Sequence, residues 1–246
     1  MHSRVVRISL VVAGLVVMVL FCLQPAAVAA PSAELGAALD KKLPDMNLEN
    51  SKLHTQVQRL LFRAHESGLV DSVNIGIEYD DSQPVPRGNL YTRNATMREQ
   101  LDAIAKGTGY VWQANGDCIN LIPKGKHGDA KWVLNQVMEG TIVVSRHSSV
   151  ATPVKDWFAQ RGISGVRDVH NVRIEGFERP PGPDPIVLHN PTLREYSNAR
   201  ERMYGNNIWS RRVKVLPLQD GETIQRTVLV CWSQCTRLVR KQEPAD

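Results

Sequence analysis

The chain lacks the short motifs by which many enzymes can be recognised. No G-x-S-x-G, H-E-x-x-H, P-loop or G-x-G-x-x-G pattern occurs in its 246 residues. Cysteine is scarce, with four in the whole chain, and no two Cys/His pairs show the spacing of a zinc site. The sequence therefore gives no reason to expect catalysis, a cofactor or a metal, although residues distant in sequence can still assemble a site.

Residues 1–29 have the three parts of a secretory signal. Arg4 and Arg7 precede an apolar run, and an A-x-A cleavage site ends at Ala29. We expect cleavage after Ala29 and a periplasmic or secreted protein with no transmembrane span. The alternative is an uncleaved N-terminal membrane anchor, but the run is a little short of the ~20 apolar residues that cross a bilayer.

The chain also lacks a run of Lys and Arg interleaved with aromatic residues. Its formal net charge is +5, and removing the signal with Arg4 and Arg7 would lower this charge by two. A weak positive charge on an exported protein makes nucleic acid a poor partner. We therefore expect no nucleic-acid binding.

Three cysteines remain after the signal, namely Cys118, Cys231 and Cys235. An odd number leaves at least one that is free or paired between chains. Cys231 and Cys235 are close enough in sequence to form a disulfide in an oxidising compartment, provided that the chain turns between them. Cys118 is then the unpaired thiol.

The pattern Asn-x-Thr-(Met/Leu)-Arg-Glu occurs twice, beginning at Asn94 and at Asn190. In each copy the Thr stands three residues before a Glu, which is the spacing of a capping box, and an apolar stripe at helical spacing follows. Matches continue upstream at a nearly constant offset and predict a tandem duplication. They include two apolar helical stripes: Leu53, Val57, Leu60 and Leu61, and Val150, Val154, Trp157 and Phe158.

The duplication predicts an α+β fold. Each unit would run strand, helix, strand, strand, helix and hairpin, with the helices packed on small mixed sheets. The first unit covers residues 44–124 and the second, more diverged unit covers 139–235. A linker at 125–138 joins them, and a tail occupies 236–246.

The dipeptide Asn115-Gly116 is a strong signal for a two-residue hairpin turn. This turn would pair Trp112 with Ile119. Cys118 would then lie on the other face of the hairpin, accessible to solvent unless the second unit covers it. In the second unit we expect a longer hairpin, and its predicted turn and facing pair are Asp220-Gly221 and Trp209 opposite Trp232.

The stretch NIGIEYDDSQPVPRGNLYTRNATMREQLDAIAKGTGYVWQANGDCINLIP resembles the short N-terminal domain of secretins and TonB-dependent receptors. The resemblance extends over about residues 50–124, and the second unit joins it only through the internal repeat. It implies a periplasmic, non-catalytic domain that contacts other proteins. The positions that carry the motif are Thr96, Leu101, Asp102, Ile104, Thr108, Gly109, Tyr110, Trp112 and Gly116.

Several polar residues that could suggest catalysis have simpler interpretations. Those at 147–149 stand where a helix cap is needed, His170 falls on a predicted strand, and Asp80-Asp81 is typical of a turn. The tryptophans could stack on sugars, but their spacing favours core packing. They are Trp112, Trp157, Trp209 and Trp232.

The function that fits these observations is an exported interaction module that binds an envelope protein. The second half has an excess of basic residues, and Arg211, Arg212, Lys214 and Arg226 form its expected interaction face. Such a face suits an acidic protein, lipid head groups or a cell-wall polyanion. The alternatives are a secreted envelope enzyme and a cell-wall or carbohydrate-binding protein whose site the sequence does not reveal.

Overall fold

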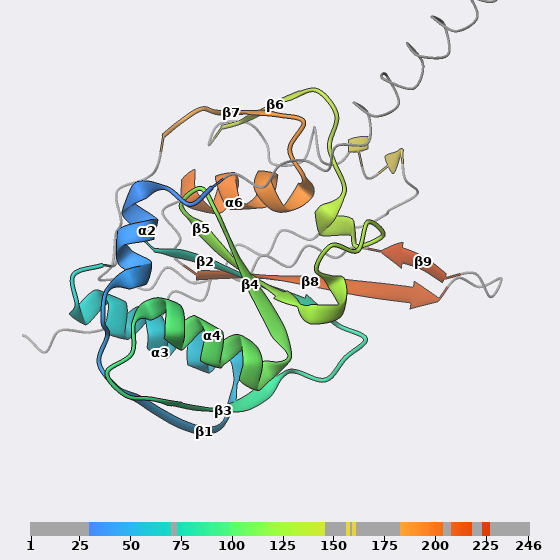
Figure 1. Ribbon diagram of the computed structural model, residues 1–246. Helices are drawn as coiled ribbons and strands as arrows, with labels where there is room; N and C mark the ends of the chain where they lie inside the picture. The colour runs from blue at the N-terminus through green and yellow to red at the C-terminus, as the bar shows by residue number, and fades with distance from the viewer. Residues whose placement is uncertain are drawn as a thin grey trace, which may run out of the picture. The chain divides into compact units, whose positions relative to one another are not determined.

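The computed structural model describes residues 30–69, 73–145, 156–157, 159–160, 183–203, 208–217 and 223–226. The predicted signal and the Cys231–Cys235 pair lie outside these residues. The fold is α+β, as predicted, with helices packed on small sheets (Figure 1). No helix in the described part of the chain is long and apolar enough to cross a membrane.

The described part contains four α-helices and two short 3-10 helices: α2 (Ala33–Asp40), α3 (Leu53–Glu66), α4 (Met97–Thr108), α6 (Leu193–Met203), η2 (Lys124–Lys126) and η3 (Val133–Asn135). Its strands are β1 (Met46–Lys52), β2 (Asn74–Asp80), β3 (Arg87–Thr92), β4 (Tyr110–Asn115), β5 (Cys118–Pro123), β6 (Thr141–Val144), β7 (Ile186–His189), β8 (Ile208–Pro217) and β9 (Thr223–Arg226).

One five-stranded sheet joins the two halves of the chain. Its strand order is β4-β5-β2-β8-β9, and β2 forms parallel ladders with β5 on one side and β8 on the other. The prediction of two separate units is corrected here, because β8 comes from the second predicted unit and pairs directly with a strand of the first. Two smaller antiparallel sheets, β1-β3 and β6-β7, flank this arrangement.

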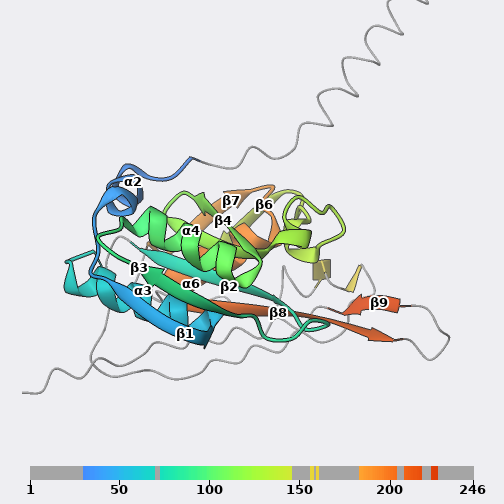
Figure 2. The same ribbon diagram turned by 60° about the horizontal axis from the view of Figure 1, so that its bottom comes forward.

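Both faces of the five-stranded sheet are covered. Helices α3 and α4 lie on one face and α6 on the other (Figures 1 and 2). Val73, just before β2, and the alternate residues Ile75, Ile77 and Tyr79 of β2 lie in the core under α3 and α4. A second core, which includes Trp132 of the segment around η3, surrounds α6. A strand with two covered faces is buried along nearly its whole length, as β2 is.

Helices α4 and α6 begin in the same way. Thr96 and Thr192 each accept a hydrogen bond from the backbone N–H of a Glu three residues on, and that Glu accepts from the backbone N–H of the Thr. Both predicted capping boxes are therefore confirmed. Gly109 ends α4 at φ 74°, a left-handed conformation that glycine adopts without strain.

The capping threonine of each helix also pairs with a residue that lies earlier in the chain. A short antiparallel bridge joins Lys42 to Thr96, and another joins Val137 to Thr192. The pairs β1-β3 and β6-β7 are likewise antiparallel. Most of the second predicted helical stripe lies outside the described residues, so the duplication stays a prediction with which these elements agree.

The register of the first hairpin differs from the predicted one. Asn115 pairs with Cys118 and Trp112 pairs with Leu121 rather than Ile119, so the two-residue loop is Gly116-Asp117. Gly116 has φ 59°, whereas Asp117 is not among the described residues with positive φ. This fits a type II′ turn, which requires glycine first. The ladder is displaced by two residues, and an even shift leaves every side chain on its predicted face.

The second hairpin also pairs differently. Lys214 pairs with Arg226 and Pro217 with Thr223, one residue away from the predicted ladder. Residues 218–222, which include the predicted turn at Asp220-Gly221, lie outside the described residues. In both views the β8–β9 hairpin extends beyond the end of β2 (Figures 1 and 2).

Candidate functional site

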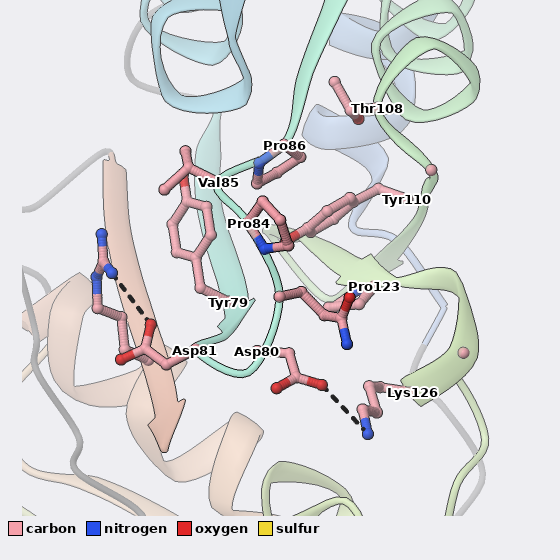
Figure 3. A pocket seen from close by; sticks show the side chains of 14 residues that line it. Tyr79, Asp80, Asp81, Pro84, Val85, Pro86, Thr108, Tyr110, Pro123 and Lys126 are labelled. Carbon is pink, nitrogen blue, oxygen red and sulfur yellow. Dashed lines mark hydrogen bonds and ion pairs between the residues drawn. The ribbon is translucent and has the colours of Figure 1, made fainter. Parts of the chain in front are cut away.

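A cavity of about 490 Å³ lies at the carboxyl end of β2. We call it the end cavity. Its lining comes from the loop after β2, the start of β4, the end of β5 with η2, and Arg212 of β8. Figure 3 shows the Tyr79 and Tyr110 side chains entering from two sides, with Pro84, Val85 and Pro86 of the loop beside them. The carboxyl ends of parallel strands are a frequent location for binding sites.

A tight turn connects β2 to this loop. The Asp80 carboxylate accepts hydrogen bonds from the backbone N–H of Ser82 at 3.0 Å and from its hydroxyl at 2.6 Å. The N–H of Gln83 donates to the Asp80 carbonyl at 2.9 Å. The turn interpretation of Asp80 is therefore confirmed, and the turn fixes the loop over the cavity.

Each carboxylate of the end cavity has a basic partner. Asp80 pairs with Lys126 at 3.3 Å, and Asp81 pairs with Arg212 at 3.0 Å (Figure 3). Burial alone would raise the pKa of Asp80, but the hydrogen bonds from Ser82 and the Lys126 ammonium outweigh it and lower the pKa below its ordinary value. Asp80 is thus an anion near neutral pH and has no proton to give as a general acid.

The two tyrosines supply most of the buried wall. Burial raises the pKa of Tyr79 to about 12, with Arg212 opposing the shift, and burial likewise raises the pKa of Tyr110. Both phenols therefore stay neutral. The Tyr110 hydroxyl donates to the Glu78 carbonyl at 2.8 Å, and the Arg212 guanidinium lies 5.2 Å from the centre of the Tyr79 ring. These contacts hold both rings in place.

A second cavity of about 460 Å³ lies between the end of α4 and the start of β4. We call it the side cavity. It shares Gly109 and Tyr110 with the end cavity, and two exposed lysines, Lys106 and Lys124, are part of its lining. Trp112 also lines it, and its indole N–H donates to Asp102 at 2.7 Å.

A polar cluster fills the space between β2 and α6. The Glu78 carboxylate is fully buried and accepts from Arg194 of α6 at both oxygens and from the Trp132 indole at 2.8 Å. Arg211 of β8 donates to Ser197 at 2.6 Å and also contacts Asn198. Because Glu78 has no exposed surface, this cluster holds the two halves together rather than offering a site to a ligand.

Two of the four residues of the predicted basic face, Arg211 and Arg212, have described side chains, and these lie in different surroundings. Arg211 is fully buried, and Arg212 pairs with Asp81 on the end cavity. Successive residues of a strand point to opposite faces, so Arg211 and Arg212 cannot share one face. Lys214 and Arg226 are paired in the β8-β9 ladder. The prediction of Arg211 as an exposed contact is therefore wrong.

Cys118 is free but buried, with 1% of its surface exposed. The sequence left this thiol accessible unless the second unit covered it, and the structure shows the covered case. The second half of the chain covers that face, as Asn115 donates to Glu195 of α6 and Arg202 pairs with Asp117 at 2.6 Å. Burial raises the pKa of the Cys118 thiol, which keeps it protonated and unreactive.

The other sequence candidates are scattered. Trp157 and Trp209 are core residues, as predicted, while Trp112 is half-buried beside the side cavity. His189 lies exposed at the end of β7, with its ring 3.1 Å from the Thr141 hydroxyl. The remaining candidates lie outside the described residues: His147, Ser148, Ser149, His170 and Trp232.

The sequence alone does not reveal the two cavities. The proline-rich loop after Asp80 was the available signal, because prolines keep a loop extended and expose its side chains. The lysine pair of the side cavity gave no signal, since Lys106 and Lys124 are separated by the whole hairpin.

Among the described residues, no group of three or more His, Cys, Asp or Glu side chains could hold a metal ion. Comparisons of the chain with family models, with curated proteins and with solved structures found no match. The two cavities are therefore the features of the described residues from which a function can be inferred.

Proposed function

We propose that this protein is an exported interaction module of the cell envelope that binds a partner protein at the end cavity and is not an enzyme. The observation that carries the proposal is the lining of that cavity, in which two fixed, mostly buried tyrosine rings lie beside an exposed proline-rich loop. Aromatic side chains and prolines in a preformed groove suit the side chains of a bound peptide.

The polar groups of the end cavity support binding rather than catalysis. Both of its carboxylates are engaged in ion pairs, and both tyrosines are neutral. No nucleophile within the described residues stands next to a general base in this cavity, as covalent catalysis would require. The ion pairs instead join the end of β2 and the loop after it to η2 and to β8.

The signal-like segment at 1–29 and the resemblance to the short N-terminal domain of secretins and TonB-dependent receptors support an envelope location. Cleavage after Ala29 would release the protein into the periplasm or the medium, whereas an uncleaved segment would tether it to the membrane. N-terminal sequencing of the exported protein distinguishes the two, since a chain that begins at Ala30 shows cleavage and one that begins at Met1 refutes it.

Site-specific photo-crosslinking in cells that export the chain tests the partner proposal. Val85 is 43% exposed on the end cavity, and Tyr91 of β3 is 55% exposed outside it. A photoreactive residue at Val85, and another at Gln83 on the same cavity, should give one common protein adduct that Tyr91 does not give. Equal adducts from all three positions, or an adduct to glycan alone at Val85 and Gln83, would overturn the proposal.

A further inference from the structure

We infer, resting on the proposed function, that the partner contributes an extended peptide with an acidic residue close to an apolar one. The apolar side chain occupies the end cavity, and the carboxylate lies against Lys106 and Lys124 in the side cavity. Three features favour such a peptide: the charges of the two cavities, the residues that both linings share, and the position of β4 at the edge of its sheet.

The two cavities differ in how their basic groups are neutralised. In the end cavity Lys126 and Arg212 are each paired with an aspartate. In the side cavity Lys106 and Lys124 are exposed and form no ion pair with any carboxylate of the described residues. The lining of the side cavity, with two lysines and one aspartate, therefore has an excess of positive charge, whereas the charged groups that line the end cavity balance one another.

The one acidic residue of the side cavity, Asp102, forms no ion pair with either lysine. Asp102 accepts the Trp112 indole N–H at 2.7 Å. Trp112 is also approached by Arg98, whose guanidinium lies 5.9 Å from the ring centre. A carboxylate supplied by a ligand can thus bind the two lysines without displacing a bond within the protein.

Gly109 and Tyr110 belong to both linings, so one ligand can reach both cavities. The backbone is fixed at this junction, because the N–H of Lys124 donates to the Gly109 carbonyl at 3.2 Å. Gly109 has no side chain to separate the cavities, and its φ of 74° favours glycine. An acidic and an apolar group near each other in one peptide match this arrangement.

Strand β4 gives the peptide a backbone to pair with. It is the outermost strand of its sheet. Among the described residues, the one bridge near its outer edge joins Pro31 to Gly116, the residue that follows the last residue of β4. Alternate residues of an edge strand direct their N–H and C=O groups outward, which allows an added strand to form a ladder. Val111 and Trp112 of this edge line the side cavity, so the ladder and the lysines are reached together.

The test uses a random peptide library displayed on phage and selected on the purified mature protein. The selected peptides should share an Asp or Glu near a large apolar residue. Binding of a labelled consensus peptide should weaken by at least ~10-fold, or about 1.4 kcal/mol, in the double variant Lys106→Glu, Lys124→Glu. Lys131→Glu, an exposed lysine outside both cavities, is the matched control and should bind as the parent does.

Two further readouts separate charge recognition from a damaged fold. A peptide with its acidic residue changed to Lys should bind the Lys106→Glu, Lys124→Glu variant better than the parent. Addition of the consensus peptide should also slow amide hydrogen exchange in β4 and leave β6 and β7 unchanged. Selected peptides without acidic residues, protection at β6 and β7 instead of β4, or full competition by inorganic polyphosphate would overturn the inference.

The two proposals can fail separately. A protein adduct from Val85 together with peptides that ignore Lys106 and Lys124 would refute the acidic peptide and leave the interaction module standing. An adduct with a second copy of this chain would likewise refute the inference. No adduct and no selected peptide would overturn both.

Discussion

Helices α4 and α6 share a local sequence but differ in their surroundings. Each follows an asparagine with positive φ, each has a Thr and Glu capping box, and each carries an arginine in its first turn. Arg98 of α4 is 45% exposed and pairs with Asp40, whereas Arg194 of α6 is 10% exposed and pairs with the fully buried Glu78. The same short pattern therefore starts a helix in both places, while the surroundings determine what its arginine contributes.

We expect the largest change in the free energy of unfolding when the two arginines are replaced. Replacing Arg194 by Ala leaves the Glu78 carboxylate buried without its main partner, which should reduce the free energy of unfolding by about 3–5 kcal/mol. Arg98→Ala should cost less than about 1 kcal/mol, because its ion pair with Asp40 is exposed. Urea unfolding of the two variants and the parent measures the difference.

Cys118 gives an independent readout of the Arg194 variant. In the parent, a thiol reagent should label Cys118 only after unfolding, because the side chain is buried beneath the second half of the chain. Arg194→Ala should speed this labelling under native conditions, as mapped by mass spectrometry, and Arg98→Ala should not. If both variants lose the same free energy of unfolding and label Cys118 at the same rate, then the two arginines contribute equally to stability.

The second prediction tests how closely the α6 side of the sheet is packed. A Cβ at Gly76 would come within 2.5 Å of the Trp209 indole nitrogen, so Gly76→Ala should destabilise the protein by about 1–3 kcal/mol. A Cβ added at Gly36 in α2 would have no neighbouring atom within 4 Å. Gly36→Ala should therefore stabilise the protein by about 0.5–1 kcal/mol. Thermal unfolding with near-ultraviolet circular dichroism measures both, and a neutral Gly76→Ala would contradict the close contact.

The third prediction concerns the feature that the two helices share. Thr96→Ala and Thr192→Ala each remove one capping box, and each should cost about 1 kcal/mol in urea unfolding. Thr→Ser at the same positions keeps the hydroxyl and serves as the control. If only one of the two variants lost stability, the capping box would stabilise only one of the two helices.

The smallest expected effect is the pH dependence of the α4 cap. The backbone N–H and the hydroxyl of Thr96 donate to Glu99 and lower its pKa. A lowered pKa stabilises the fold at pH above the unfolded value of about 4.3, and this contribution is lost as the pH falls through the folded value. An NMR titration of Glu99 should show the lowered pKa, and Thr96→Ala should move it back; an unchanged titration would contradict the bond.

Local chemistry made much of the fold predictable. The capping boxes at Thr96 and Thr192, the alternation of β2 and the turn near Gly116 each depend on residues within a few positions of one another. The register of the first hairpin was missed by two residues, because Asn-Gly and Gly-Asp are both plausible turns and a tertiary contact distinguishes them. Asp117 pairs with Arg202 of α6, far along the chain.

The candidate site was less predictable than the fold. Its lining gathers the ends of β2 and β5, the start of β4 and Arg212 of β8, and no local pattern states which strands become neighbours. The proline-rich loop could be recognised as a loop from sequence alone. Its position over Tyr79 and Tyr110 could not, since that depends on how β2 is placed between β5 and β8.

The sequence by itself determined where α3, α4, α6 and most strands occur, because capping, periodicity and glycine conformations act over a few residues; α2 was not expected. Only the tertiary structure decided that β8 pairs with β2 and that α6 covers the second face of the sheet. That pairing buries Glu78, Cys118 and Arg211, all of which a half-covered sheet would expose. The physical reason is that a strand offers two edges and two faces, and its neighbours, which may be distant in the chain, determine which of them meet water.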